Sequence, residues 1–188
     1  MNESTALMFT IPSWYVIGPI FIIGLLGLFF WMKRHGRKEK TLQFVMLVSL
    51  LIYLCGVIHF VFFPIDVNIG LYANQTPWYK TVNWIPILTI DVKTFVLNVI
   101  MLIPLGMYVP FLRMKTAASA KTAAKFGFMM SLSIELLQLL IRVTLGNGRS
   151  TDINDLLANT LGAVIGYLIV KSLFKQPLFK SLFHRFQS

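Results

Sequence analysis

Five long apolar stretches limit what this chain can fold into, because each can cross the hydrocarbon core of a bilayer as a helix. Such a crossing takes about 20 mostly apolar residues. Hydrophobic residues make up 56% of the 188, a share that excludes a soluble globular domain of this size. The stretches are Pro12–Met32, Thr41–Phe63, Thr94–Leu112, Phe126–Leu145 and Ile153–Leu173. The sequence therefore predicts an all-α integral membrane protein with five transmembrane helices, a multi-pass protein of the cell membrane.

The distribution of lysine and arginine predicts the orientation of these spans. If the N-terminus lies outside, all but four of the 17 basic residues fall in segments on the inner side. The four exceptions are Lys80, Lys93, Arg142 and Arg149. Basic residues concentrate in the cytoplasmic segments of membrane proteins, so we expect an N-out, C-in topology. The first span has no basic stretch before it and no small-residue cleavage site after it, so we interpret it as a retained span and not a signal peptide.

Two segments outside the spans have a membrane character of their own. The run Trp84–Ile90 is apolar but too short to span, which predicts a re-entrant or interfacial segment at residues 84–90. The tail Phe174–Phe186 mixes phenylalanine with basic residues, as does a helix that lies on the cytoplasmic surface. The chain thus divides into residues 1–44 (the first span and a basic loop), residues 45–172 (a helical membrane domain) and residues 173–188 (a basic aromatic tail).

Polar and ionisable side chains interrupt the last three spans. A charge at the centre of a membrane helix costs on the order of 2.5–3.5 kcal/mol, so such groups are kept where they pair, line a cavity or have a function. In the fourth span, Ser131, Glu135, Gln138 and Arg142 share one face because they are spaced by four, three and four residues. At 1.5 Å per residue, Glu135 falls near the midplane and Arg142 near the outer surface. Glu135 is then either protonated or paired, with Arg142 as a candidate partner.

The neighbouring spans place polar groups in the same outer half of the membrane. Asp152 and Asp155 stand at the outer start of the fifth span, and Asn159 lies one turn deeper. Asn98 lies about one turn below the outer surface in the third span, and His59 stands near the outer end of the second. The sequence therefore predicts a polar cavity open to the outside, or a buried hydrogen-bond network at that depth.

Purely structural roles remain open for the same residues. Asp152 and Asp155 have the N-cap and N3 spacing of a helix start. The amides of Asn98, Gln138 and Asn159 can join helices without any ligand. Small residues at spacings of four also predict close helix packing on one face of the fifth span. These small residues are Ala158, Gly162 and Gly166.

Four short motifs follow one another between residues 45 and 172. They are Val82-Asn-Trp-Ile-Pro86, Asn98-Val-Ile-Met-Leu-Ile-Pro104-Leu-Gly106, Ser131-Leu-Ser-Ile-Glu135-Leu-Leu-Gln138, and Thr151-Asp-Ile-Asn-Asp155-Leu-Leu-Ala-Asn159-Thr-Leu-Gly162 with Gly166. In this order they resemble the VanZ-like family of small bacterial membrane proteins. The resemblance implies a four-spanning VanZ-like domain over residues 45–172, with the first span as an N-terminal addition. With the motif residue Asn83 included, the candidate cavity residues are Asn83, Asn98, Glu135, Gln138, Arg142, Asp152, Asp155 and Asn159.

The resemblance also implies a function at the envelope of a Gram-positive bacterium. VanZ is associated with raised resistance to teicoplanin, a glycopeptide antibiotic with a lipid tail. We therefore expect a protein that binds a lipid-tailed ligand in its outer cavity, either a lipoglycopeptide or a lipid-linked wall precursor, and that lowers susceptibility to teicoplanin-like drugs. The resemblance supplies motif positions and no catalytic residues.

Two other functions stay open on the sequence alone. The carboxylates Glu135, Asp152 and Asp155 could serve a membrane enzyme acting on an envelope lipid, or a small transporter that couples to protons. No metal-ligand cluster of known spacing and no paired histidines stand in the sequence, so we lean against an enzyme and expect no metal site and no cofactor. Membrane lipids are the expected partners. No basic patch belongs to a soluble domain, so we expect no nucleic-acid binding, and the oligomeric state cannot be read from the sequence.

Overall fold

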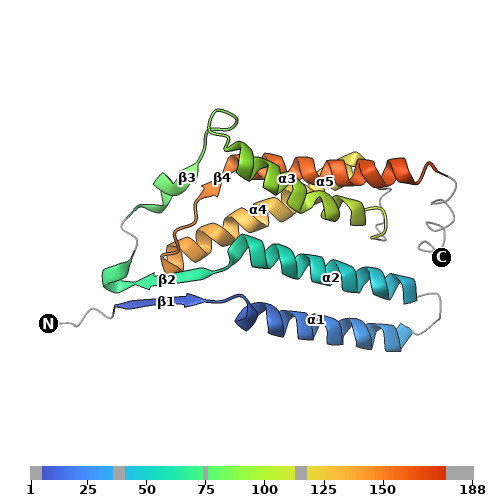
Figure 1. Cartoon of the computed structure of the whole chain (residues 1–188), viewed down its shortest axis with the longest axis horizontal. Coiled ribbons are helices and arrows are strands. Elements are labelled where there is room, and N and C mark those ends of the chain that lie inside the picture. The colour runs from blue at the N-terminus through green and yellow to red at the C-terminus, as the bar shows by residue number, and fades with distance from the viewer. Residues whose placement is uncertain (1–5, 36–40, 74–75, 113–117, 177–188) are drawn as a thin grey trace.

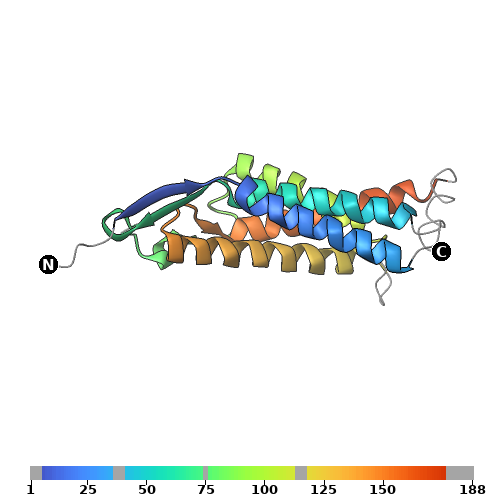
Figure 2. The same cartoon turned by 90° about the horizontal axis from the view of Figure 1, so that it is seen from below.

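A computed structural model describes residues 6–35, 41–73, 76–112 and 118–176. Its helices are α1 (Trp14–His35), α2 (Thr41–Phe62), α3 (Val92–Tyr108), α4 (Ala120–Leu145) and α5 (Ile153–Leu173). Four of them are long and apolar enough to cross a membrane, and α3 is a shorter apolar helix of 17 residues. The five lie roughly along one axis and form an elongated bundle (Figures 1 and 2). The predicted class, an all-α integral membrane protein, is confirmed.

The helix ends differ from the predicted spans where local chemistry starts or stops a helix. α4 begins six residues earlier than the fourth predicted span, because the side chain of Ser119 accepts a hydrogen bond from the Thr122 N–H and caps the helix. α3 ends at Tyr108, two residues before Pro110, which has no backbone N–H to continue the helical hydrogen bonds. α3 continues through Pro104, which lies inside the helix.

α3 and α5 pack against each other without side chains between their backbones. A Cβ atom added at Gly162 would overlap the Val99 carbonyl, and one added at Gly166 would overlap the Ile103 carbonyl. On the other helix, a Cβ at Gly106 would overlap the Ala163 carbonyl. Small residues on both helices are what let two membrane helices approach this closely. Ala158, Gly162 and Gly166 are all buried on α5.

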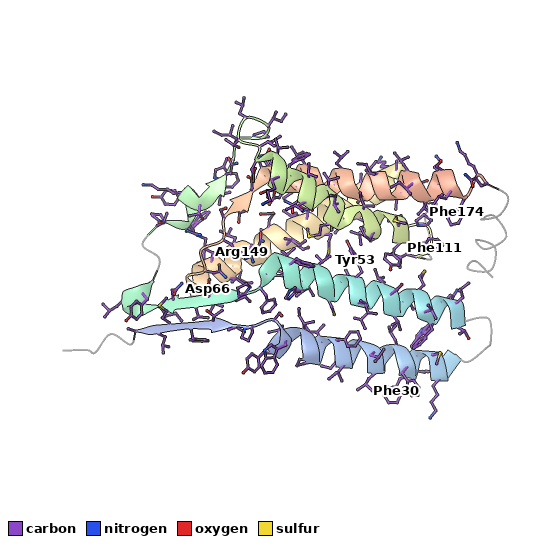
Figure 3. All side chains as sticks on the ribbon, in the orientation of Figure 1. Phe30, Tyr53, Asp66, Phe111, Arg149 and Phe174 are labelled. Atoms are coloured by element: carbon purple, nitrogen blue, oxygen red, sulfur yellow. The ribbon has the colours of Figure 1, made fainter. Side chains whose placement is uncertain are left out.

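Within the bundle, α1 and α2 lie side by side next to α3, α4 and α5 (Figure 1). None of the residues in the apolar window of α1 is buried. α2 joins the rest through a cluster near its C-terminal end, in which Val57, Val61 and Phe62 pack with Ile134 of α4. Nearer the middle of α2, the Tyr53 hydroxyl donates a hydrogen bond of 2.8 Å to the Met101 carbonyl of α3. Figure 3 shows Tyr53 between these two helices.

Four short strands gather at one end of the bundle, which we call the strand end. β1 (Leu7–Ile11) pairs with β2 (Ile65–Ile69) in antiparallel register, from Leu7 opposite Ile69 to Ile11 opposite Ile65. This pair extends beyond the ends of α1 and α2 (Figure 2). β3 (Val82–Asn83) pairs with β4 (Thr151–Asp152) in parallel. Two 3₁₀ turns, Gly70–Tyr72 and Trp78–Thr81, lie between β2 and β3.

The segment 84–90 is a turn-rich loop and not a helix. It projects sideways from the start of α3 (Figure 1). Its apolar side chains are exposed, Leu88 to 87% and Ile87 to 70%. This loop exposes an apolar surface and does not cross the bundle, and its position at the membrane interface remains a prediction. The tail from Phe174 is described only as far as residue 176, so the surface helix expected there lies outside the described residues.

Candidate functional site

The chain between α4 and α5 folds back along α4. Helix α4 ends at Leu145, and Gly146 follows with φ of 69°, a conformation that glycine adopts at no steric cost. β4 then runs back beside α4 (Figure 1). This fold-back loop, from Gly146 to Asp152, ends where the Asp152 N–H donates to the Glu135 carboxylate at 3.1 Å. Glu135 lies ten residues before Leu145, so α5 starts about 15 Å below the end of α4.

This fold-back corrects the depth predicted for Glu135. Glu135 is level with the start of α5, whereas the sequence analysis placed it about half a membrane deeper. That estimate assumed that neighbouring spans begin and end at one level. An extended loop that returns along its own helix breaks this assumption, and it brings the carboxylate to the height of Asp152.

Two arginines hold the fold-back loop through backbone carbonyls. The Arg142 guanidinium donates to the Arg149 carbonyl at 2.8 Å and to the Asn147 carbonyl at 3.4 Å. The Arg149 guanidinium donates to the Phe63 carbonyl at 3.0 Å, which ties the loop to the end of α2. The candidate pairing of Arg142 with Glu135 is replaced by other partners, since Arg142 donates to loop carbonyls and Glu135 accepts from the Asp152 N–H. Arg142 instead lines a separate cavity of 280 Å³, together with Asn68, Trp78 and Gly146.

Asn83 and Asp152 organise the start of α5. Asp152 is the N-cap and accepts from the Asn154 N–H at 2.8 Å. Its second oxygen accepts from the Asn83 side chain at 3.1 Å, and Asn83 also donates to Thr89 at 2.6 Å. Asn154, which the sequence analysis missed, accepts from the Ile87 N–H at 2.8 Å. These residues position the 84–90 loop against α5. Neither Asn83 nor Asp152 lines the cavity of 570 Å³ that the other predicted residues surround.

The other predicted residues meet around a cavity of 570 Å³, which we call the polar cavity. Its polar lining comes from α3, α4, α5 and the fold-back loop, and consists of Thr94, Asn98, Glu135, Gln138, Arg149, Asp155 and Asn159. Its apolar lining comes from α2, α3 and α4, and consists of Phe60, Val61, Leu97, Ile100, Met101 and Ile134. Five of the eight predicted residues therefore surround one space, and Asn83, Arg142 and Asp152 stand outside it.

The floor of the polar cavity is set by a short hydrogen-bond chain. The Ser131 hydroxyl donates to the Asp155 carbonyl at 3.3 Å, so its oxygen is left as an acceptor. The Asn159 amide nitrogen donates to that oxygen at 2.9 Å. This fixes the orientation of the Asn159 amide and leaves its Oδ1 atom buried, with no hydrogen-bond partner among the described residues. Asn159 itself is 1% exposed.

Two further amides border the cavity. The Gln138 side chain donates to the Val61 carbonyl at 3.1 Å and so joins α4 to α2. The Asn98 side chain faces the Asp155 carboxylate, but its buried amide nitrogen makes no hydrogen bond of regular geometry. Buried amides without partners are uncommon in folded proteins. Among the described residues, the Asn159 Oδ1 atom is thus an unused acceptor at this cavity, whereas the Asn98 amide interacts with the Asp155 carboxylate.

The cavity reaches the lateral surface of the bundle. Phe60 is 76% exposed and Leu97 is 56% exposed, and both line the cavity. A ligand head can therefore contact the polar floor while an attached apolar chain stays beside α2 and α3. His59, predicted near the outer end of the second span, is exposed next to Phe60. Among the described residues, no three His, Cys, Asp or Glu side chains group closely enough to hold a metal ion.

A second lateral cavity lies at the opposite end of the α2–α3 seam. It has a volume of 490 Å³, and its lining is mostly apolar. Residues that line it include Ser49 of α2, Pro104 of α3 and Phe174 beyond α5. Phe174 meets Phe111 there edge to face, with ring centroids 5.5 Å apart (Figure 3). The Tyr53–Met101 hydrogen bond lies between this apolar cavity and the polar cavity.

The fold and the site together define a multi-span helical membrane protein with a polar cavity at the strand end of its bundle. A family model described as VanZ/LLP1 matches residues 50–175. The chain belongs to the VanZ/LLP1 family, and the match covers every residue that lines the polar cavity while leaving out α1 and β1. Comparison with curated proteins and with solved structures gives no match.

Proposed function

We propose that this chain is a bacterial cell-membrane protein that binds a lipid-tailed amphiphile in the polar cavity and thereby lowers susceptibility to teicoplanin-like lipoglycopeptides. The observation that carries the proposal is the combination of a polar floor with an exposed apolar rim in one cavity. Membership of the VanZ/LLP1 family supports it, because the namesake VanZ is associated with teicoplanin resistance.

The acyl tail is the basis of the selectivity that we propose. Each CH₂ group buried in the membrane contributes about 0.8 kcal/mol to membrane binding. Teicoplanin carries such a tail and vancomycin does not. In the N-out topology the strand end faces the outside, where the drug arrives. The protein would hold the drug at the cavity, or compete for its membrane-bound form, before it reaches its wall target.

The test is to express the chain in a susceptible Gram-positive host and to measure growth inhibition by teicoplanin, deacylated teicoplanin and vancomycin. We expect a raised inhibitory concentration for teicoplanin and little change for the other two. The raised value should fall in Glu135→Gln and Asp155→Asn, which change charge with little change in shape. The matched control is Asp66→Asn, an exposed carboxylate on β2 that does not line the cavity. Equal protection against all three drugs would contradict the proposal.

A further inference from the structure

Among the described residues, the three ionisable groups of the polar cavity bind other partners and not one another. Arg149 donates to the Phe63 carbonyl, and Glu135 accepts from the Asp152 N–H. Asp155 belongs to the first turn of α5 and faces Asn98. Charges kept only to stabilise a fold are expected to pair directly once they leave water. Here two carboxylates and one guanidinium surround an open volume of 570 Å³.

The floor of this volume and its fold-back loop offer opposite hydrogen-bonding chemistry. On the floor, the carboxylates of Glu135 and Asp155 are acceptors when ionised, and the unpartnered Oδ1 of Asn159 is an acceptor whose direction Ser131 fixes. From the fold-back loop, Arg149 lines the same cavity and offers only donors. Figure 3 shows Arg149 near the strand end of α2. A ligand that fits both carries a donor-rich cation and an anion in the same head group.

We propose that the polar cavity recognises the head of an aminophospholipid, with the primary ammonium on the floor between Glu135, Asp155 and Asn159 and the phosphate at Arg149. This inference rests on the proposed function, since it names the head chemistry of the amphiphile bound there. A primary ammonium has three N–H donors, which match the three acceptors of the floor. A guanidinium pairs well with phosphate oxygens. The acyl chains leave past Phe60 and Leu97, which line the cavity and are exposed.

The experiment uses the full chain in detergent and four lipids with identical dioleoyl chains, detected by native mass spectrometry. The lipids are phosphatidylethanolamine, its N-acetyl derivative, phosphatidylcholine and phosphatidylglycerol. N-acetylation removes the positive charge and keeps the phosphate, and choline keeps the charge but has no N–H donor. We expect phosphatidylethanolamine to be retained roughly tenfold better than the N-acetyl derivative, because the derivative loses the charged donors that bind the floor. Phosphatidylcholine should be intermediate.

Substitutions test which residues bind the ammonium of the head and which residue binds its phosphate. Asp155→Asn and Glu135→Gln should each reduce the preference for phosphatidylethanolamine over its N-acetyl derivative. Arg149→Gln should weaken all four lipids alike, and the control Asp66→Asn should change nothing. The comparison of the four lipids uses the unsubstituted protein, so it tests the inference even if a substituted protein fails to fold.

The outcomes separate this inference from the proposed function. Equal retention of the four lipids would overturn the aminophospholipid assignment and leave amphiphile binding standing. A preference for phosphatidylethanolamine that persists in Asp155→Asn and Glu135→Gln would also overturn the assignment to the floor. Retention of no lipid at all would contradict both this inference and the proposed function.

Discussion

Glu135 combines two properties that substitution can separate. Its carboxylate accepts a hydrogen bond from the backbone of Asp152, which holds the start of α5, and the same carboxylate borders the polar cavity. A glutamine keeps an oxygen acceptor of the same reach and loses the charge. An alanine loses both, and leaves a buried N–H without its partner. The structural and the ligand-binding contributions of this residue are therefore distinguishable.

We expect Glu135→Gln to unfold at nearly the temperature of the unsubstituted protein and Glu135→Ala to be less stable by about 1–3 kcal/mol. Both should lose protection against teicoplanin. Thermal unfolding in detergent measures the first effect, and growth inhibition measures the second. If Glu135→Gln kept full protection, the charge would have no part in the function.

The sequence did not predict which of the two arginines, Arg142 or Arg149, lines the polar cavity. Both are basic residues near the outer end of the fourth span, and nothing in their types distinguishes them. The sequence placed Arg142 in the cavity because it shares a helix face with Glu135. In the structure, carbonyls of the fold-back loop bind Arg142, and the same loop carries Arg149 to the cavity. The path of a loop decides this assignment, and helical spacing contains no information about it.

At the scale of elements, the contact between α3 and α5 is the closest in the bundle and therefore the most sensitive to added volume. Gly162 and Gly166 each face a backbone carbonyl of α3. A carbonyl cannot move aside as the tip of a flexible side chain can. We predict that Gly162→Ala and Gly166→Ala each destabilise the protein by about 1–3 kcal/mol.

A matched control for this prediction exists in α1, where a Cβ atom at Gly18 or Gly27 would have no neighbour within 4 Å. Alanine at either position should leave stability unchanged or raise it slightly, because glycine is a poor helix former. Thermal unfolding in detergent compares all four variants. Equal stability for the α1 and α5 variants would contradict the close backbone approach.

The seam between α2 and α3 depends on Tyr53. Its hydroxyl donates to the Met101 carbonyl and lies within reach of the Leu105 backbone, one turn on. We predict that Tyr53→Phe lowers stability by about 1 kcal/mol, since the Met101 carbonyl loses a donor. Tyr15→Phe on the exposed face of α1 is the control. A Tyr53→Phe protein as stable as the control would mean that this bond does not hold the seam.

Helices were predictable from the sequence and strands were not, for a physical reason. An apolar run of about 20 residues specifies a membrane helix by its own composition. β1 forms only because Leu7–Ile11 meets Ile65–Ile69, a partner more than fifty residues away. Such pairing depends on where α1 and α2 place their ends. The fold-back before α5 is of the same kind, because it needs Glu135 and Phe63 as anchors.

For the whole molecule, the arrangement of the two ends makes the topology testable. The strands lie at one end and the start of α4 at the other (Figure 2). The polar cavity is lined by Arg149 and the first turns of α5, which belong to the strand end. Ser150 is exposed at the strand end and Ala118 is exposed at the opposite end. In a Cys55→Ala background, a membrane-impermeant maleimide should label Ser150→Cys in intact cells and should reach Ala118→Cys only after lysis. Labelling of Ala118→Cys in intact cells would contradict the N-out, C-in topology.

A high-resolution structure of the full chain in lipid nanodiscs shows directly whether the polar cavity at the strand end holds the head of an amphiphile. We expect elongated density whose head lies beside Glu135, Asp155 and Asn159 and whose tail passes between α2 and α3 along Phe60 and Leu97. A structure in which Glu135 points at lipid tails, or in which α2 closes over a cavity that holds only water, would contradict this expectation.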